Sequence, residues 1–298
     1  MNVNIIGAGA VGKTLGRLMV HHQLASIQGI VNQSITSAQK AIDFMGQGQA
    51  FASLHELPNA TIIFITTPDD CIETTAYNYS KTADVYEQIV VHCSGALNSD
   101  ALKSLKERGA WVASIHPMMS FAKPNQAIEH FHGTFCAMEG DEEALHVLEP
   151  LFQAMGAQTY GILKDKKILY HAAGVFASNY VVTLIEEASV CFTLAGIEKT
   201  ISRNIIEHLV NSTITNIAHA TSPIKALTGP LARGDVGVIQ QHLDALLPSQ
   251  QALYRHLGQA TLEKINLEPA IWEAMRQLLT NRCCTSIPLR DDSSFKPN

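Results

Sequence analysis

Short apolar segments alternate with amphipathic ones along the first part of the chain. The apolar segments read as strands: Val3–Ile6, Ser26–Val31, Thr61–Ile65, Ile89–His92, Trp111–Ile115 and Thr134–Met138. Helical spacing of apolar residues follows most of them, over residues 11–19, 37–45, 99–108 and 142–155. Near-continuous apolar strands separated by helices are typical of a parallel sheet buried on both faces. We therefore predict an α/β domain over residues 1–160.

The pattern changes after residue 160, where no strand run of comparable strength occurs. Helical periodicity predicts helices over residues 171–180, 211–220, 236–247, 248–264 and 269–279. Residues 281–298 lose the periodicity and contain two prolines. The prediction is an N-terminal Rossmann-type parallel-sheet domain (1–160), an all-helical domain for substrate binding and dimerisation (161–280), and a loosely ordered tail (281–298).

A glycine motif joins the first predicted strand to the first predicted helix. It reads Gly7-Ala8-Gly9-Ala10-Val11-Gly12 and fits G-x-G-x-x-G, the dinucleotide-binding fingerprint. Gly7 allows the tight turn, Gly9 lets backbone approach a pyrophosphate, and Gly12 lets the helix pack closely on the strand. The amides of Ala10 and Val11 then open the helix toward the phosphates. The motif alone is weak evidence, but its position between a strand and a helix favours nucleotide binding over an ordinary turn.

The end of the second predicted strand indicates which nicotinamide cofactor is bound. NAD enzymes usually carry Asp or Glu there, which accepts a hydrogen bond from the ribose 2′-hydroxyl. This chain has Asn32, Gln33 and Ser34 instead, with Lys40 nearby. These side chains do not repel a 2′-phosphate and can donate hydrogen bonds to it. We therefore predict NADP(H), although no Arg is present at this position.

Three turns follow the carboxyl ends of predicted strands, where ligands bind in open parallel sheets. The first turn is Thr66-Thr67-Pro68, predicted to contact the cofactor, and the Asp69 or Asp70 that follows can also simply cap a helix. The second contains Ser94 and Gly95, whose small size lets a substrate approach the nicotinamide, although Ser-Gly is also a common turn. The third begins at His116. We predict that Ser94 and Gly95 contact the cofactor, that Ser94 and His116 contact the substrate, and that His116 also takes part in catalysis.

A group of polar and small residues occupies one face of the helix predicted over residues 171–180. At about 100° per residue, His171, Gly174 and Ser178 line that face and Asn179 flanks it. We predict a catalytic role for His171, Ser178 and Asn179. A purely structural histidine with locally bonded Ser and Asn side chains is the alternative.

A second candidate for substrate binding lies where the helical pattern breaks, at residues 225–235. Arg233 can hold a substrate carboxylate bidentately, or it can pair with Asp235 in a surface connection between helices.

Composition narrows the classes of function. The chain has 298 residues, a net charge of −6 and a pI of about 6.1, and no run of Lys or Arg, which argues against nucleic-acid binding. We see no apolar segment of membrane length and no leader before the first strand, so we expect a cytoplasmic protein without a membrane partner. The six cysteines form no C-x-x-C pair, and His130 and His132 lack further ligands, so no metal site is predicted.

Taken together, six stretches resemble a known group of proteins. They are GAGAVG (7–12), TTPDD (66–70), VHCSGAL (91–97), SIHPMMSF (114–121), HAAGVFASNY (171–180) and LTGPLARGD (227–235). The chain resembles the Rossmann-like oxidoreductases whose C-terminal part was long catalogued as a domain of unknown function. These are distant relatives of pyrroline-5-carboxylate reductase, ketopantoate reductase and the 3-hydroxyacid dehydrogenases. The resemblance covers nearly the whole chain apart from the tail.

The resemblance implies an NADP-linked reductase that acts on a small molecule and usually forms a dimer. Some members are similar to an alternative type of ketopantoate reductase, which makes reduction of ketopantoate to pantoate the leading hypothesis. Reduction of a C=N bond, as in pyrroline-5-carboxylate reductase, is the closest competitor, and an NADP-binding sensor without turnover is a third hypothesis. Conventional relatives place a catalytic Lys on the first helix of the second domain. Here Lys164, Lys166 and Lys167 are expected to precede that helix, and His171 takes the role of proton donor.

Overall fold

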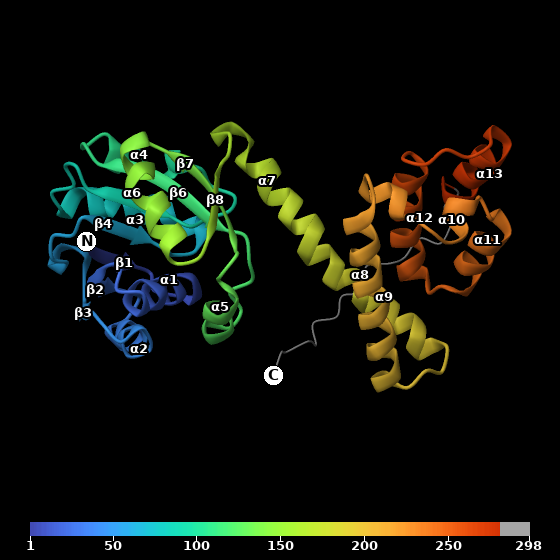
Figure 1. Ribbon diagram of the computed structural model, residues 1–298, viewed down its shortest axis with the longest axis horizontal. Coiled ribbons are helices and arrows are strands. Elements are labelled where there is room, and N and C mark those ends of the chain that lie inside the picture. Colours follow the sequence, from blue (N-terminus) through green and yellow to red (C-terminus); the bar gives the residue numbers. More distant parts are fainter. Residues whose placement is uncertain (281–298) are drawn as a thin grey trace. The chain divides into compact units, whose positions relative to one another are not determined.

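The computed structural model describes residues 1–280 (Figure 1). The chain forms two compact units, of which the first is Met1–Asn179 and the second begins at Tyr180. Residues 161–179 are thus part of the first unit, and within them Lys167 contacts Ser114 and Tyr170 contacts His116. The predicted tail, 281–298, lies outside the described residues.

The first unit is built on an eight-stranded sheet with the order β3-β2-β1-β4-β5-β6-β7-β8. Its strands are β1 (Asn2–Ile6), β2 (Ser26–Val31), β3 (Gln49–Phe51), β4 (Ile62–Ile65), β5 (Ile89–His92), β6 (Trp111–Pro117), β7 (Phe135–Gly140) and β8 (Gln158–Gly161). All neighbouring strands are parallel except β6 and β7, which are antiparallel. The predicted α/β fold is confirmed.

Helices cover both faces of this sheet (Figure 1). They are α1 (Ala10–His21), α2 (Ile35–Met45), α3 (Asp69–Thr82), α4 (Lys103–Lys106), α5 (Pro124–His130) and α6 (Glu142–Ala154). Two buried apolar layers result, one around Phe64 and Phe152 and the other around Ile63 and Tyr79. Phe64 and Ile63 are neighbours in β4 that point to opposite faces, which is why this strand reads as continuously apolar.

Some local details differ from the sequence prediction. The predicted helix 99–108 is a 3₁₀ turn (Ser99–Leu102) followed by the single turn α4, because Asn98 caps the turn by accepting from the Asp100 amide. Strands β3 and β8 were not predicted. Both are short and largely exposed, so they lack an apolar pattern.

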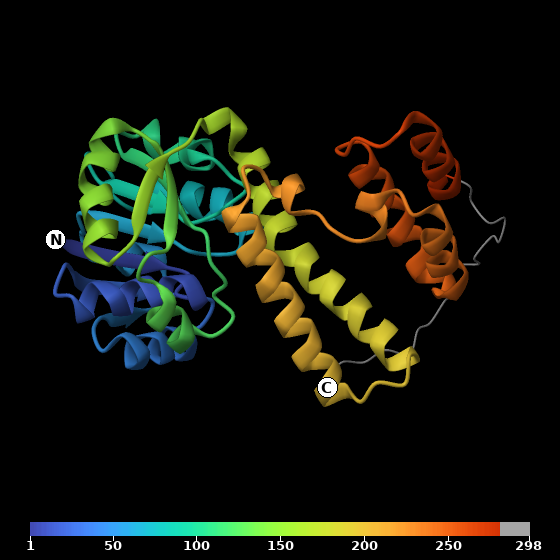
Figure 2. The ribbon, with the colours of Figure 1, turned by 45° about the vertical axis from the view of Figure 1, so that its right-hand side comes forward.

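The second unit is helical, as predicted. Its helices are α8 (Tyr180–Leu194), α9 (Lys199–His219), α10 (Pro230–Arg233), α11 (Val236–Ala245), α12 (Pro248–Leu262) and α13 (Pro269–Thr280). Helices α11, α12 and α13 enclose a small core of Ile239, Leu243, Leu262, Met275 and Leu279. Helices α8 and α9 pack side by side (Figure 2) and contribute little to that core.

The helix predicted over residues 171–180 belongs to a longer and less regular run. It consists of α7 (Lys167–Gly174), a π-helical turn (Val175–Asn179) and α8. The prediction that Ser178 shares a face with His171 assumed regular α-helical rotation, which the wider π turn interrupts.

The same run corrects a second expectation. By length and composition, residues Lys164–Leu194 could cross a membrane, so the expectation that the chain has no apolar segment of membrane length is wrong. Core helices of soluble proteins can have the same length and apolar composition.

Candidate functional site

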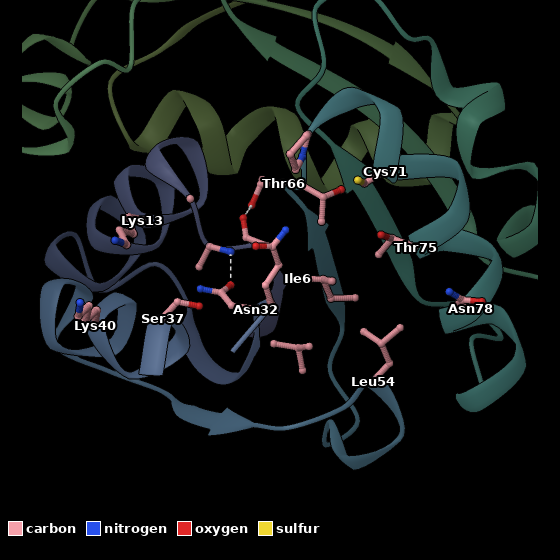
Figure 3. A pocket seen from close by; sticks show the side chains of 17 residues that line it. Ile6, Lys13, Asn32, Ser37, Lys40, Leu54, Thr66, Cys71, Thr75 and Asn78 are labelled. Atoms are coloured by element: carbon pink, nitrogen blue, oxygen red, sulfur yellow. Dashed lines mark hydrogen bonds between the residues drawn. The ribbon is translucent and has the colours of Figure 1, made fainter. Parts of the chain in front are cut away.

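A cavity of about 580 Å³ lies at the carboxyl ends of β1, β2 and β4 (Figure 3). Its lining comes from the glycine turn, the ends of β2 and β4, and helices α2 and α3: Ile6, Gly7, Ala8, Gly9, Lys13, Val31, Asn32, Gln33, Ser37, Lys40, Leu54, Thr66, Thr67, Pro68, Cys71, Thr75 and Asn78. Most of the predicted cofactor residues are thus brought to one cavity at the predicted edge of the sheet.

The glycine turn has the geometry that a phosphate-binding turn requires. Gly7 has φ +85°, and a Cβ there would lie 2.6 Å from Thr67 Cγ2, so no other residue fits. Gly9 is open, with no neighbouring atom closer than 3.9 Å to the position of a Cβ. Thr66 fastens the turn by donating from Oγ1 to the Gly7 carbonyl oxygen at 2.9 Å (Figure 3).

Two further features fit a dinucleotide in this cavity. Helix α1 begins after Gly9 with no side-chain cap and no acidic residue in its first turn, so its amides face an anion site without a protein acceptor. The Thr67 hydroxyl is buried in the cavity wall without a hydrogen-bond partner. Buried polar groups are rarely left unpaired, which indicates that a bound molecule provides the hydrogen-bond partner of the Thr67 hydroxyl.

The residues that follow β2 form one side of the cavity. Asn32 Oδ1 accepts from the Ala8 amide at 2.7 Å, which leaves the side-chain NH₂ group to donate (Figure 3). Ser34 is the N-cap of α2 and accepts from the Ser37 amide, and it is Ser37 and Lys40 that line the cavity together with Lys13. The side predicted to hold a 2′-phosphate thus carries amide and hydroxyl groups and two lysines.

We expect Asn32→Asp to lower the preference for NADPH over NADH by about tenfold or more. An Asp oxygen can keep the bond to the Ala8 amide, but its charge repels a 2′-phosphate, and like charges ~4 Å apart near a surface cost about 4 kcal/mol at most. Dissociation constants of NADPH and NADH measured by fluorescence titration check the ratio. Asn78→Asp, across the cavity (Figure 3), is the matched control and leaves the ratio unchanged. Equal ratios for the two variants would contradict the assignment.

A second group of side chains lies next to the cavity, at the ends of β5 and β6. Asp69 follows Pro68 of the cavity wall and accepts from Ser94 Oγ at 2.7 Å. The next residue, Gly95, lies between two histidines: a Cβ there would be 2.8 Å from His116 Nε2 and 2.6 Å from His171 Cδ2. Gly95 therefore packs directly against both rings, and any side chain at position 95 would collide with them; we call Gly95, His116 and His171 the histidine cluster.

A buried charged pair that sequence reasoning missed belongs to the same group of side chains. Lys167 is 1% exposed, and its ammonium contacts Ser114 Oγ and lies 3.7 Å from Glu139 Oε1. Glu139 also accepts from the Ser99 amide and hydroxyl, both at 2.8 Å. Lys167 is the first residue of α7, so the expectation that it precedes the helix is wrong. Its spacing of four residues from His171, which places both on one helix face, was the available signal.

Burial is the largest cause of the shifted pKa values in this group of side chains. It lowers the pKa of Lys167 to about 8, although Glu139 acts in the opposite direction. Burial, followed by the charge of Lys167, lowers the pKa of His116 to about 4 and that of His92 to about 3. His92 Nδ1 accepts from the Ser94 amide, so a neutral His92 holds the turn that carries Gly95. Perturbed pKa values that cluster beside a ligand cavity are typical of a functional site.

The other predicted residues are placed as follows. Ser178 and Asn179 are exposed in the π turn. Arg233 is the last residue of α10 in the second unit, where Asp235 caps α11 by accepting from the Val238 amide. Within residues 1–280, no group of three or more His, Cys, Asp or Glu side chains could hold a metal ion.

Two parts of the chain match known protein families. Residues 1–117 match the Rossmann-like domain, and residues 134–261 match a domain of unknown function, DUF2520. The chain combines a Rossmann-like domain with a DUF2520 domain. The Rossmann-like match contains Gly95 and His116, whereas the DUF2520 match contains Glu139, Lys167 and His171, so both contribute to this group of side chains. The resemblance noted from the sequence motifs is confirmed.

Solved structures share this architecture. A Bacteroides fragilis protein provisionally named an NADP oxidoreductase is 19% identical, with a TM-score of 0.72 over 88% of this chain and 98% of its own. The Thermotoga maritima protein TM1727 is 26% identical, with a TM-score of 0.67 over 92% and 99%. Pyrroline carboxylate reductase from Plasmodium falciparum with NADP bound is 12% identical, with a TM-score of 0.58 over 94% and 98%. No curated protein sequence matches the chain. The Rossmann-like and DUF2520 domains thus have the fold of NADP-linked oxidoreductases.

Proposed function

We propose that the protein is an NADPH-dependent reductase of a small substrate with a C=O or C=N bond. One observation carries the proposal: a cavity suited to a dinucleotide lies beside the histidine cluster of Gly95, His116 and His171. Asp69 and Ser94 join the two, because Asp69 follows the cavity wall and Ser94 precedes Gly95. A substrate bound against the cluster would therefore meet both a hydride donor and proton donors.

NADPH, when bound, supplies the hydride that reduces the substrate carbon. The glycine turn and Thr67 would hold its phosphates and ribose, and Asn32, Ser37 and Lys40 its 2′-phosphate. Reduction of a C=O bond leaves an oxygen that must take a proton from the protein. His171, half-buried in the histidine cluster, is our proton donor, since an imidazole exchanges protons near neutral pH. Lys167 adds positive charge close to the developing alkoxide.

Ketopantoate is the leading substrate in this proposal, and the motif resemblance supports it. The likeness in fold to pyrroline carboxylate reductase supports an imine as the second candidate. NADPH oxidation followed at its absorbance band tests both, with ketopantoate, other 2-keto acids and cyclic imines as acceptors and NADH as a parallel cofactor. Turnover with one acceptor supports the reductase and selects the bond. Binding of NADPH without turnover on the whole panel favours the third hypothesis, a cofactor-binding sensor.

We also propose that a second copy of this chain covers the α8–α9 pair. Helix α8 is strongly apolar but has no buried residue, and α9 buries only Ser202 and Ile206. The pair exposes large apolar side chains: Val182, Leu184, Leu194, Ile201, Leu209 and Ile214. A helix that is apolar on all sides requires a covering surface. Glu186 and Glu187 near the middle of α8 disfavour a lipid environment, so a symmetric dimer is the better partner.

Leu209→Glu is expected to convert the dimer into a monomer. Leu209 is 53% exposed, so a charge there leaves the fold intact but becomes buried on association. Light scattering after size-exclusion chromatography measures the mass. Tyr77→Glu, at a residue 50% exposed on α3, is the control and leaves the dimer unchanged. A monomeric wild-type protein, or one recovered only with membranes, would refute the proposal.

A further inference from the structure

We propose that Ser94 and Asp69 are positioning residues that tie the turn carrying Gly95 to the wall of the cofactor cavity, so that occupation of the cavity steadies the histidine cluster. The Ser94 hydroxyl then holds the protein's own backbone and does not bind the substrate. This inference rests on the proposed reductase function and deepens it, because it assigns a task to the residues between the cofactor cavity and the proton donor.

The Ser94 hydroxyl has no hydrogen bond left to offer a ligand. A hydroxyl can donate one hydrogen bond and accept two. Ser94 Oγ donates to Asp69 Oδ2 at 2.7 Å. It accepts from the amides of Ala96 and Leu97, at 3.2 and 3.0 Å. Ser94 is also only 5% exposed. The three bonds commit this hydroxyl to the turn of residues 94–97.

The bond between Asp69 and Ser94 joins the ends of two neighbouring strands. Asp69 follows β4 as the first residue of α3, and Ser94 follows β5, which pairs with β4. Asp69 is preceded by Thr67 and Pro68, which both line the cofactor cavity. A hydroxyl that donates to a carboxylate forms a strong hydrogen bond, and 2.7 Å is typical of one. Contacts that hold Thr67 and Pro68 in place therefore also hold the acceptor of the Ser94 hydroxyl.

His92 supports the same turn from its buried side. Its Nε2 lies 3.0 Å from the Asn98 carbonyl oxygen, which can only accept, so Nε2 carries the proton. Its Nδ1 then accepts from the Ser94 amide at 3.2 Å. His92 is fully buried, and burial lowers its pKa to about 3, so the neutral ring keeps both bonds at neutral pH. The turn is thus held internally, and the bond to Asp69 sets how it lies against the cavity wall.

The position of this turn matters because Gly95 packs against both rings of the histidine cluster. A Cβ at position 95 would lie 2.8 Å from His116 Nε2 and 2.6 Å from His171 Cδ2. In such close packing, a small shift of the turn also displaces the two rings. Asp69, Ser94 and Gly95 thus form a continuous path of contacts from the cavity wall to the proposed proton donor.

An electrostatic role is the alternative for Asp69. Burial is the largest cause of the lowered pKa of His116 and of Lys167, and the Asp69 carboxylate acts against it in both. Asp69→Asn separates the two roles, because it removes the charge but keeps an oxygen that accepts from Ser94, whereas Asp69→Ala removes both. Asp70→Ala is the matched control, since it removes an equal charge from the same first turn of α3.

Amide hydrogen exchange followed by NMR tests the link without turnover, with NADP⁺ as the ligand. We expect Ala96 and Leu97 to exchange about tenfold faster in Asp69→Ala than in the wild type, the effect of losing a hydrogen bond to a charged group. Saturating NADP⁺ should slow both amides in the wild type, in Asp70→Ala and in Asp69→Asn, but not in Asp69→Ala. Protection that persists in Asp69→Ala, or an Asp69→Asn variant that matches Asp69→Ala, would overturn the proposal.

Steady-state kinetics measures the consequence for the reaction. Ser94→Ala and Asp69→Ala should each lower kcat about tenfold with little change in the KM of the acceptor, since small misplacements of reacting groups are costly. Adding Asp69→Ala to Ser94→Ala should cost nothing more, because the bond between them is already gone. A Ser94→Ala variant that raises the KM and keeps kcat would show instead that the hydroxyl binds the substrate. The expected exchange pattern without turnover of any acceptor would reject the reductase proposal alone.

Discussion

Replacing His171 by Ala is expected to lower kcat by about 10²–10⁴-fold, the usual worth of a positioned acid–base group. The His171 imidazole lies half-buried against Gly95, and alanine leaves no group there that can exchange a proton. Steady-state kinetics with the acceptor identified in the oxidation assay measures the loss. The affinity for NADPH should stay within about twofold, because His171 does not line the cofactor cavity.

The control for this variant is His146→Ala. His146 is exposed on α6 and belongs to neither the cavity nor the histidine cluster, so its loss should leave kcat unchanged. If His171→Ala weakened NADPH binding in parallel with kcat, the residue would support the cofactor and could not be the proton donor.

Lys167→Met should destabilise the protein by about 3–5 kcal/mol, the usual effect of removing one partner of a buried ion pair. Methionine fills similar volume, but Glu139, 5% exposed, would keep a buried charge with no cation beside it. The free energy of unfolding from urea titration, followed by circular dichroism, gives the difference.

Two comparisons test the cause of that loss. Lys164→Met removes an ammonium that pairs with exposed Asp100 at 2.6 Å, and it should cost less than about 1 kcal/mol. Lys167→Met combined with Glu139→Gln should recover part of the loss, since the unpaired charge is gone. A cost for Lys167→Met no larger than that for Lys164→Met would show that the pair is not buried in solution.

The apolar pattern predicted the sheet well where strands are buried on both faces. Residues Ile62–Ile65 of β4, which meet a packed layer on each side, are an example. Strand β8, mostly exposed at the sheet edge, is held by backbone pairing with β7, and no side-chain pattern records such pairing. The π turn at Val175–Asn179 likewise has no signal in the spacing of apolar residues, so the sequence predicted a regular α-helix there.

The candidate site was predictable where the chemistry is local to a motif. The glycine turn and Asn32 were predicted from short stretches of adjacent residues, and both line the cavity. The pairing of Lys167 with Glu139 depends on two strands and a helix meeting in space, so its burial could not be derived from the sequence. Tyr170 was missed for the same reason, because its partner His116 is 54 residues away.

The antiparallel step from β6 to β7 has a geometric consequence for α7. Because β7 and β8 run opposite to the other strands, β8 ends at the edge of the sheet where those strands begin. Helix α7 then runs along β6 toward the edge where the cofactor cavity lies. Lys167 meets Ser114, and Tyr170, about one helical turn later, meets His116, two strand positions later. Three helical residues rise about 4.5 Å and two strand residues about 6.6 Å, so the helix and the strand advance in the same direction toward the cofactor edge. A single-residue insertion between these contacts in α7 or in β6 would change this spacing. It would separate the Lys167–Glu139 pair from His116.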